Sequence, residues 1–280
     1  MKPQDFEFLR TLVQRESGIS LYEEKMYLIN ARLKPVLKQR NLQNIDELII
    51  RLRWQPTPQL IQEVINVLTI HETFFFRDDA PFDVLRTTVL PALIKARSEA
   101  RSLNIWSAAC SSGQEPYSIA MMLREYFPEL RNWHIYIYAT DISAPILEKA
   151  RAGQYSQFEV ERGLPANFLI YFEQDGQGWR VKEAIRTMVT FETANLVQPW
   201  PAYTPAMDII LMRNVLIYFE NDTKKKILGN VKKYLHHDGY LFLGQSETVS
   251  QLDTSFELCH YSSSSCFRLA PVYTQQAVSQ

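Results

Sequence analysis

The sequence predicts an α/β protein: a mostly parallel sheet domain with an inserted small antiparallel β-subdomain, preceded by a small all-helical domain. Three observations indicate this fold class. Up to about residue 70 the apolar residues recur only at helical spacing, and after about residue 100 short apolar runs alternate with helical patterns. Between residues 153 and 185 a Gly-rich turn instead separates two apolar-aromatic stretches. Strands that alternate with helices imply a mostly parallel sheet covered on both faces.

The N-terminal region is predicted to hold four short helices. Two of them follow from helical spacing of apolar residues, which are Phe6, Leu9 and Val13 in the first and Met26, Ile29, Leu33 and Leu37 in the second. Pro35 is expected to kink or shorten the second helix. The segments NIDELIIRLRW and TPQLIQEVINVLTI predict the other two, the last opened by Thr57 as N-cap and Pro58 at the first position.

Five apolar runs predict the strands of the sheet: SLNIWSAA, HIYIYATD, TMVTFETANL, MDIILMRN and GYLFLGQ. Helical patterns such as EPYSIAMMLREYF, SAPILEKARAG and DTKKKILGNVKKYLH lie between most of them. The stretch FLIYFEQDGQGWRVKEAI reads as a β-hairpin within an insertion at about 153–190. We therefore divide the chain into a helical domain (1–72), a linker (73–87) and a sheet domain (88–280).

The segment HETFFFRDD, residues 71–79, lies where the predicted bundle meets the predicted sheet domain. Its three phenylalanines are expected to pack the two domains together. Its polar ends are then free to face a cleft between them.

Composition and charge exclude several classes of protein. The chain is 46% hydrophobic with a net charge of −1, so no overall field attracts nucleic acid or a membrane. It has no apolar run near the roughly 20 residues of a membrane span, and the N-terminus MKPQDFEFLR lacks the apolar stretch of a signal peptide. Three cysteines without metal-ligand spacing predict no metal site and a reducing, cytoplasmic location.

One segment is nevertheless basic. Between residues 25 and 53 seven bases face two acids, a local charge of +5. Either this is a solvated helical face or it is a docking surface for an acidic protein partner. Lys25 and Arg32 are seven residues apart and therefore share one edge of the second helix.

The stretch NIWSAACSSGQEPYS has the order strand, small-residue loop, helix, which places a ligand at the carboxyl end of the strand. The loop has a single glycine, Gly113, and lacks the G-x-G-x-x-G pattern of dinucleotide binders, which disfavours a nucleotide-dependent oxidoreductase. Glu115 lies near the start of the following helix, expected at about Pro116, where free N–H groups could hold a ligand carboxylate.

Polar residues follow other strands at the same predicted edge. Asp141 ends the second strand, where an acidic residue commonly binds ribose hydroxyls, although it could instead cap the next helix. Asn195 follows a third strand, and Arg213 and Asn214 follow a fourth, before an aromatic segment with Tyr218. Together these features favour a nucleoside that carries an amino-acid tail, which describes S-adenosylmethionine.

With these segments, the chain resembles the chemotaxis receptor glutamate methyltransferases, the CheR family, over nearly its full length. The matching segments are HETFFFRD, WSAACSSGQEPYS, ATDIS, ANL, LMRNVLIYF and DGYLFLGQSE. The resemblance implies a Rossmann-like S-adenosylmethionine-dependent methyltransferase domain with an inserted β-subdomain after the helical domain. The family often has asparagine at the position of His71.

The resemblance also implies roles for individual residues. The cofactor S-adenosylmethionine, with S-adenosylhomocysteine as product, is expected to contact His71, Thr73, Arg77, Glu115, Asp141, Asn195, Leu196, Arg213 and Asn214. Tyr218 is expected beside the transferred methyl group and Arg32 near the substrate carboxylate. Because a glutamate with a pKa near 4.3 is already ionised at neutral pH, the reaction requires no general base and no metal.

The implied partners are the cytoplasmic methylation helices of chemoreceptors, bound through Lys25, Arg32 and Lys34 of the second helix. No nucleic acid and no membrane insertion are expected, and a further signalling regulator is left open. Two alternatives remain: a non-catalytic adaptor that binds S-adenosylmethionine or S-adenosylhomocysteine, and a methyltransferase for a small molecule. RNVLIYF lacks the Pro-Pro-aromatic element of amino-directed nucleic-acid methyltransferases.

Overall fold

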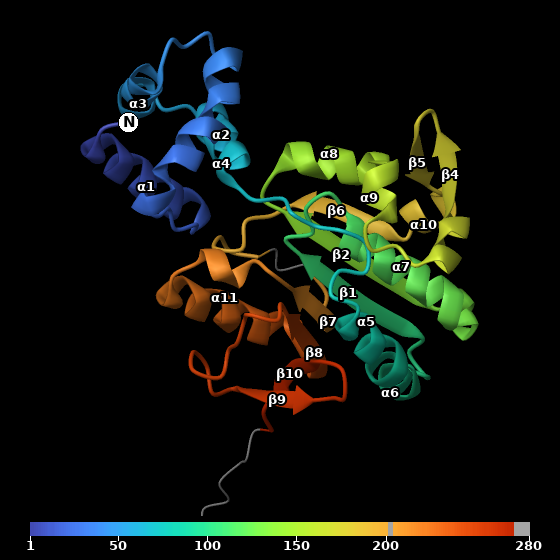
Figure 1. Ribbon diagram of the computed structural model, residues 1–280. Helices are drawn as coiled ribbons and strands as arrows, with labels where there is room; N and C mark the ends of the chain where they lie inside the picture. Colours follow the sequence, from blue (N-terminus) through green and yellow to red (C-terminus); the bar gives the residue numbers. More distant parts are fainter. Residues whose placement is uncertain (201–203, 272–280) are drawn as a thin grey trace, which may run out of the picture.

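The computed structural model describes residues 1–200 and 204–271, and its N-terminal part is a helical bundle (Figure 1). The bundle comprises α1 (Pro3–Ser17), the 3-10 turn η1 (Glu23–Lys25), α2 (Met26–Gln39), α3 (Ile45–Trp54) and α4 (Pro58–Leu68). Leu9, Leu33 and Leu48 are fully buried in a core that belongs to the bundle alone. As predicted, Thr57 caps α4, its Oγ1 accepting a bond from the Leu60 N–H at 3.2 Å. Pro35 does not end α2, which continues to Gln39.

The second part is built on a seven-stranded sheet of order β6-β2-β1-β7-β8-β10-β9. Five strands are parallel, and β10 alone runs antiparallel to both its neighbours. In sheet order the bounds are β6 Val189–Thr193, β2 His134–Asp141, β1 Ser102–Ala108, β7 Met207–Met212, β8 Leu235–Leu243, β10 Ser265–Leu269 and β9 Phe256–His260. The predicted α/β fold class is therefore confirmed.

Alternate residues of the central strands enter two separate cores, one on each face of the sheet. On β7, Ile209 and Leu211 pack on one face while Ile210 and Met212 pack on the other. The first face is covered by α5 (Ala80–Val84), α6 (Leu90–Ala96), α7 (Gln114–Tyr126) and α8 (Ala144–Ala152). The second face is covered by α11 (Asn221–Tyr234), so all the central strands are buried on both sides, as a parallel sheet requires.

The insertion forms a three-stranded antiparallel sheet of order β3-β5-β4. It contains β3 (Gln154–Ser156), α9 (Gln157–Glu161), the 3-10 segment η4 (Ala166–Tyr171), β4 (Phe172–Asp175), β5 (Gly178–Val181) and α10 (Glu183–Arg186). The expected hairpin is the β4–β5 pair, whose turn holds Gly176 at φ 59°.

Several elements were not predicted. Residues 80–96 are helical throughout, with a π-helical segment η2 (Leu85–Val89) between α5 and α6, so much of the predicted linker 73–87 is regular structure. Strands β9 and β10 and the short segments η3 (Pro128–Asn132) and η5 (Leu216–Tyr218) were also missed. The domain division at residues 72 and 87 stays a proposal. No helix of the described part is both long and apolar enough to cross a membrane.

The phenylalanines of HETFFFRDD pack differently from the expectation. Phe75 and Phe76 are buried in the core of the sheet domain, not in that of the bundle. Phe75 makes edge contacts with Tyr155 and Phe172 of the insertion, at ring-centroid distances of 5.0 and 5.4 Å. This segment therefore joins the insertion to the sheet domain, and the bundle is held by other contacts.

Candidate functional site

A cavity of about 650 Å³ lies between the bundle and the carboxyl ends of the parallel strands. Its walls come from the α1–α2 loop, α2, the end of α4, the HETFFFRDD segment and the loops after β1, β2, β6 and β7. All eleven residues singled out from the sequence line it: Arg32, His71, Thr73, Arg77, Glu115, Asp141, Asn195, Leu196, Arg213, Asn214 and Tyr218. The structure thus brings the whole predicted set to one place, while their individual roles stay predictions.

The loop after β1 is fixed by the residue that ends β2. Asp141 Oδ2 accepts a bond from the Ser111 N–H at 2.9 Å, and its Oδ1 accepts one from the Ser143 N–H at 3.0 Å. Ser143 is the N-cap of α8, so Asp141 helps to organise that helix start while it also lines the cavity. Burial raises the pKa of Asp141. Asp141 lines the cavity, and each oxygen of a carboxylate can accept more than one hydrogen bond, so hydroxyl groups of a ligand could bind there.

Glu115 and Arg213 bind each other. Helix α7 begins at Gln114, two residues earlier than expected, which places Glu115 in its first turn. Arg213 Nη1 donates to Glu115 Oε2 at 3.0 Å, and Arg213 Nη2 donates to Asp78 Oδ2 at 2.8 Å and to the Arg77 carbonyl at 2.7 Å. Ser107 Oγ donates to the other Glu115 oxygen at 2.7 Å. This network joins β1, the loop after β7 and the HETFFFRDD segment in the wall of the cavity.

The bundle is joined to the cavity wall through Asn195 and the α1–α2 loop. Asn195 Nδ2 donates to the Glu16 carbonyl at the end of α1 at 2.7 Å. Ile19 forms an isolated antiparallel β-bridge with Phe219, and the Ser20 N–H donates to the Tyr218 carbonyl at 2.9 Å. The bundle therefore completes the cavity through direct backbone pairing with the loop that carries Tyr218.

Tyr218 and Arg32 face the cavity from opposite domains. The half-buried Tyr218 phenol has its pKa raised by burial, a shift that the nearby Arg77 and Arg32 guanidinium groups oppose. Its hydroxyl is therefore protonated at neutral pH and can donate a hydrogen bond. Arg32 Nη1 donates to the Leu68 carbonyl at 3.1 Å, which ties the guanidinium to the end of α4.

The HETFFFRDD segment contributes His71, Thr73 and Arg77 to the cavity wall. His71 Nε2 lies 2.9 Å from Thr69 Oγ1, and the His71 carbonyl accepts a bond from Ser111 Oγ at 2.9 Å. Arg77 Nη1 donates to the Glu72 carbonyl at 2.8 Å, a hydrogen bond between two residues of the same segment.

Backbone strain concentrates in the HETFFFRDD segment and in the loops after β1 and β7, and three of the strained residues, Ala109, Ser111 and Asn214, line the cavity. Eight non-glycine residues of the described chain have positive φ, and six of them lie in HETFFFRDD or in the loops after β1 and β7. These six are Phe76, Asp78, Asp79, Ala109, Ser111 and Asn214. Such conformations cost about 1–3 kcal/mol each and cluster at ligand sites, where the surrounding contacts hold them in place.

The cavity suits a nucleoside that carries an amino-acid tail. It offers one buried carboxylate, Asp141, for hydroxyl groups, and it has apolar walls such as Leu196. Among the described residues, Ser20 Oγ and Arg213 Nε are buried without a hydrogen-bond partner, and both residues line the cavity. Ser20 was not singled out from the sequence, because it lies in a loop of the bundle without any motif.

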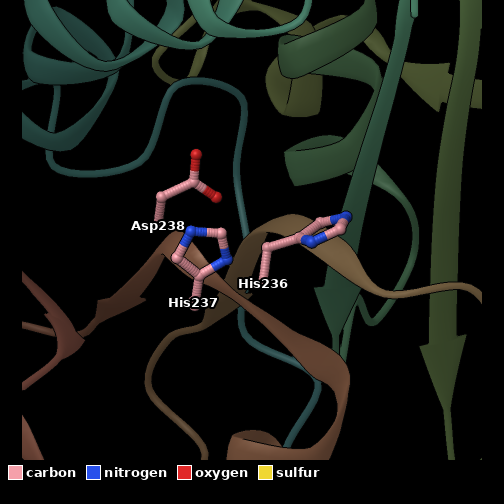
Figure 2. A group of neighbouring side chains, drawn as sticks. All are labelled: His236, His237 and Asp238. Atoms are coloured by element: carbon pink, nitrogen blue, oxygen red, sulfur yellow. The ribbon is translucent and has the colours of Figure 1, made fainter. Parts of the chain in front are cut away.

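One group of potential metal ligands lies elsewhere, at the amino-terminal start of β8 (Figure 2). Ligand atoms of His236, His237 and Asp238 lie within 4.8 Å of one another. Both oxygens of Asp238 accept bonds from Arg97, at 2.6 and 2.8 Å, which holds the pKa of Asp238 at about 2. Both oxygens of the Asp238 carboxylate are thus occupied by the ion pair with Arg97. The group lies at the amino ends of the parallel strands, opposite the end that forms the cavity.

Comparison with known proteins gives two family matches and a series of relatives. The CheR methyltransferase, SAM binding domain, matches residues 71–264, and the CheR methyltransferase, all-alpha domain, matches residues 4–69. Chemotaxis protein methyltransferase 1 of Pseudomonas aeruginosa is 40% identical over 270 residues, covering 94% of this chain and 97% of that protein. Chemotaxis protein methyltransferase Cher2 of Pseudomonas putida is 39% identical over 260 residues, covering 91% and 94%.

Proposed function

The chain belongs to the CheR methyltransferase family and is an S-adenosylmethionine-dependent methyltransferase of chemotaxis, and from that premise we propose that it methylates glutamate γ-carboxylates of chemoreceptors. The observation that carries the proposal is that Arg32 and Tyr218, from the two domains, line the same cavity as the predicted cofactor residues. The proposed substrates are the cytoplasmic methylation helices of these receptors, so the enzyme would act in the cytoplasm.

In this proposal the cofactor lies along the carboxyl ends of β1, β2, β6 and β7. Asp141 would accept bonds from its ribose hydroxyls, and the Glu115–Arg213 network would hold the amino-acid tail. Leu196 and Asn195 would form the wall nearest the bundle. When bound, S-adenosylmethionine supplies an electrophilic methyl group.

The chain's own residues then need only orient and shield the substrate. A glutamate carboxylate is ionised at neutral pH, so it needs no proton acceptor to become a nucleophile. Tyr218, whose raised pKa keeps its hydroxyl protonated, can donate a hydrogen bond to one carboxylate oxygen and leave the other free to react. Catalysis would therefore rest on alignment of the reacting atoms, which can contribute about 7–11 kcal/mol to lowering a barrier.

The mouth of the cavity supports a helical protein substrate. Its lining includes four exposed apolar side chains, Tyr22, Leu28, Ile70 and Ile217, which are 51%, 38%, 44% and 44% exposed. Lys25 and Arg32 line the same opening. An amphipathic helix that presents a glutamate from a partly apolar face would match this apolar and basic rim.

A charge-reversal pair tests the predicted docking role of the bases at the second helix, of which Lys25 lines the cavity and Lys34 does not. Lys25→Glu with Lys34→Glu should weaken methyl transfer to receptor while S-adenosylmethionine affinity stays within a factor of about two, because surface charges mainly steer association. Lys225→Glu with Lys226→Glu on α11 is the matched control with the same change in net charge, and it should retain transfer. If both pairs lose transfer equally, the effect is one of net charge and the proposed surface is wrong.

A labelling experiment tests the reaction itself. The protein is incubated with methyl-labelled S-adenosylmethionine and chemoreceptor membranes, and the product is treated with alkali. A γ-methyl ester releases volatile labelled methanol, whereas N-methylation leaves stable label. Cofactor binding without any transfer to receptor would instead support a non-catalytic adaptor.

A further inference from the structure

Outside the cavity wall, one carboxylate holds the loop that carries Tyr218. Glu247 Oε2 accepts bonds from the Asn214 N–H at 2.7 Å and from the Gly244 N–H at 2.6 Å, and its Oε1 accepts one from the Ile217 N–H at 3.2 Å. The acceptor thus connects the loop after β8 to both ends of the short loop after β7. Glu247 is itself absent from the cavity lining.

The local backbone is shaped around this carboxylate. Asn214 adopts φ 59°, a left-handed conformation that asparagine tolerates better than most residues. A side chain at Gly244 would place its Cβ 2.8 Å from Glu247 Oε2 and 2.9 Å from the Asn214 nitrogen. Only glycine therefore allows the end of β8 to approach the Asn214 loop this closely. Bonds from backbone N–H groups to a carboxylate are charge-assisted and roughly twice as strong as neutral ones.

The opposite side of the same loop is held by the bundle. The Ser20 N–H donates to the Tyr218 carbonyl, and Ile19 pairs with Phe219. Tyr218 therefore lies between two anchors, with Glu247 on the side of the sheet and the α1–α2 loop on the side of the bundle. Loss of the Glu247 anchor would leave the Asn214 and Ile217 N–H groups without their carboxylate acceptor, while Leu216 between them stays buried in the core.

We propose that Glu247 is a positioning residue for methyl transfer, which fixes the Asn214–Ile217 turn so that the Tyr218 hydroxyl is held at the reacting carboxylate. The inference rests on the proposed function of Tyr218 in methylating a glutamate. It assigns Glu247 no contact with cofactor or substrate. Its effect is predicted on turnover, through the geometry of Tyr218, and less on cofactor affinity.

A graded pair of variants tests the inference. Glu247→Gln retains one carbonyl oxygen, which can accept the bonds from the Asn214 and Gly244 N–H groups, but it places an amide N–H₂ against the Ile217 N–H. Glu247→Ala loses all three acceptor contacts. We expect kcat to fall by about 100-fold in Glu247→Ala, the order expected for a misplacement of about 1 Å, with an intermediate loss in Glu247→Gln. S-adenosylhomocysteine affinity by calorimetry should change by less than about threefold. Glu257→Gln, an exposed glutamate on β9, is the control.

Two further readouts separate positioning from general damage. Hydrogen exchange of the Asn214 and Ile217 amides should accelerate in Glu247→Ala while the amides of β1 and β2 keep their protection. In a Tyr218→Phe background, Glu247→Ala should cost much less than it does alone, because both changes act on the same hydroxyl. Equal kcat in Glu247→Ala and wild type, or additive losses in the double variant, would overturn the inference. If the wild-type protein transfers no methyl group, the proposed function is wrong. Hydrogen exchange still tests whether Glu247 anchors the turn, because that measurement does not depend on activity.

Discussion

Removal of the Arg213 cation should destabilise the fold by far more than a surface change would. The Arg213 side chain is 2% exposed and the side chains of its partners Glu115 and Asp78 are 12% and 25% exposed, so Arg213→Met leaves two largely buried carboxylates without their cation. Breaking a buried ion pair by removing one partner costs about 3–5 kcal/mol. Against a total stability of about 5–15 kcal/mol, this loss should be plain as a lower urea midpoint measured by circular dichroism.

A double variant tests the reasoning behind that magnitude. Most of the cost in Arg213→Met is assigned to uncompensated charge, so adding Glu115→Gln should recover about 0.5–3 kcal/mol of stability. The glutamine carbonyl can still accept the bond from Ser107 Oγ, which lies 2.7 Å from Glu115 Oε1. A loss of unfolding free energy below about 1 kcal/mol in Arg213→Met would refute the buried network as a source of stability. So would a loss in the double variant that equals the sum of the losses in Arg213→Met and Glu115→Gln.

Three other predictions concern turnover, cofactor affinity and acid stability. Tyr218→Phe should lower kcat far more than it lowers cofactor affinity, and comparable losses would place the hydroxyl in the cofactor pocket. Asp141→Asn should weaken S-adenosylmethionine binding by about 1–3 kcal/mol in calorimetry, because it removes a charged acceptor, and unchanged affinity would leave it as a capping residue only. Arg97 lowers the pKa of Asp238 from 3.8 to about 2, so this ion pair stabilises the fold fully above pH 4 and its contribution is lost as the pH falls from about 4 toward 2. Asp238→Asn should therefore cost about 1–2 kcal/mol of unfolding free energy at pH 7 and almost nothing near pH 2, and an equal cost at both pH values would contradict the linkage.

The sequence predicted the elements of the sheet well where their burial was uniform. The run HIYIYATD is β2 from His134 to Asp141, as expected, because its middle from Ile135 to Ala139 is continuously apolar and its last five residues are buried. Strand β9 at the sheet edge was missed, since Phe256–His260 is largely exposed, and β10 was missed because only two adjacent residues of Ser265–Leu269 are buried. The helical stretch from Ala80 to Ala96 was missed because it begins inside what was read as a linker.

Convergence of the site residues was also predictable from the sequence. Asp141, Asn195 and Arg213 each follow an apolar run, and parallel strands bring their carboxyl ends to one edge. The family was inferred correctly from the six ordered segments that resemble it, and the fold class and the cofactor class were also inferred correctly. The pattern alone did not reveal which partners each polar group would find.

Those partners were decided by the tertiary structure. Arg213 reaches Glu115 across 98 residues of sequence and Asn195 reaches Glu16 across 179, so two residues expected only to bind cofactor also hold the domains and strands together. Glu247 lies within a recognisable segment, yet its role depends on the close approach of β8 to the left-handed turn at Asn214. Periodicity and strand order are local consequences of burial, and they could be inferred from the chain itself. Hydrogen-bond partners depend on distances set when separate elements pack, and only the folded arrangement determines them.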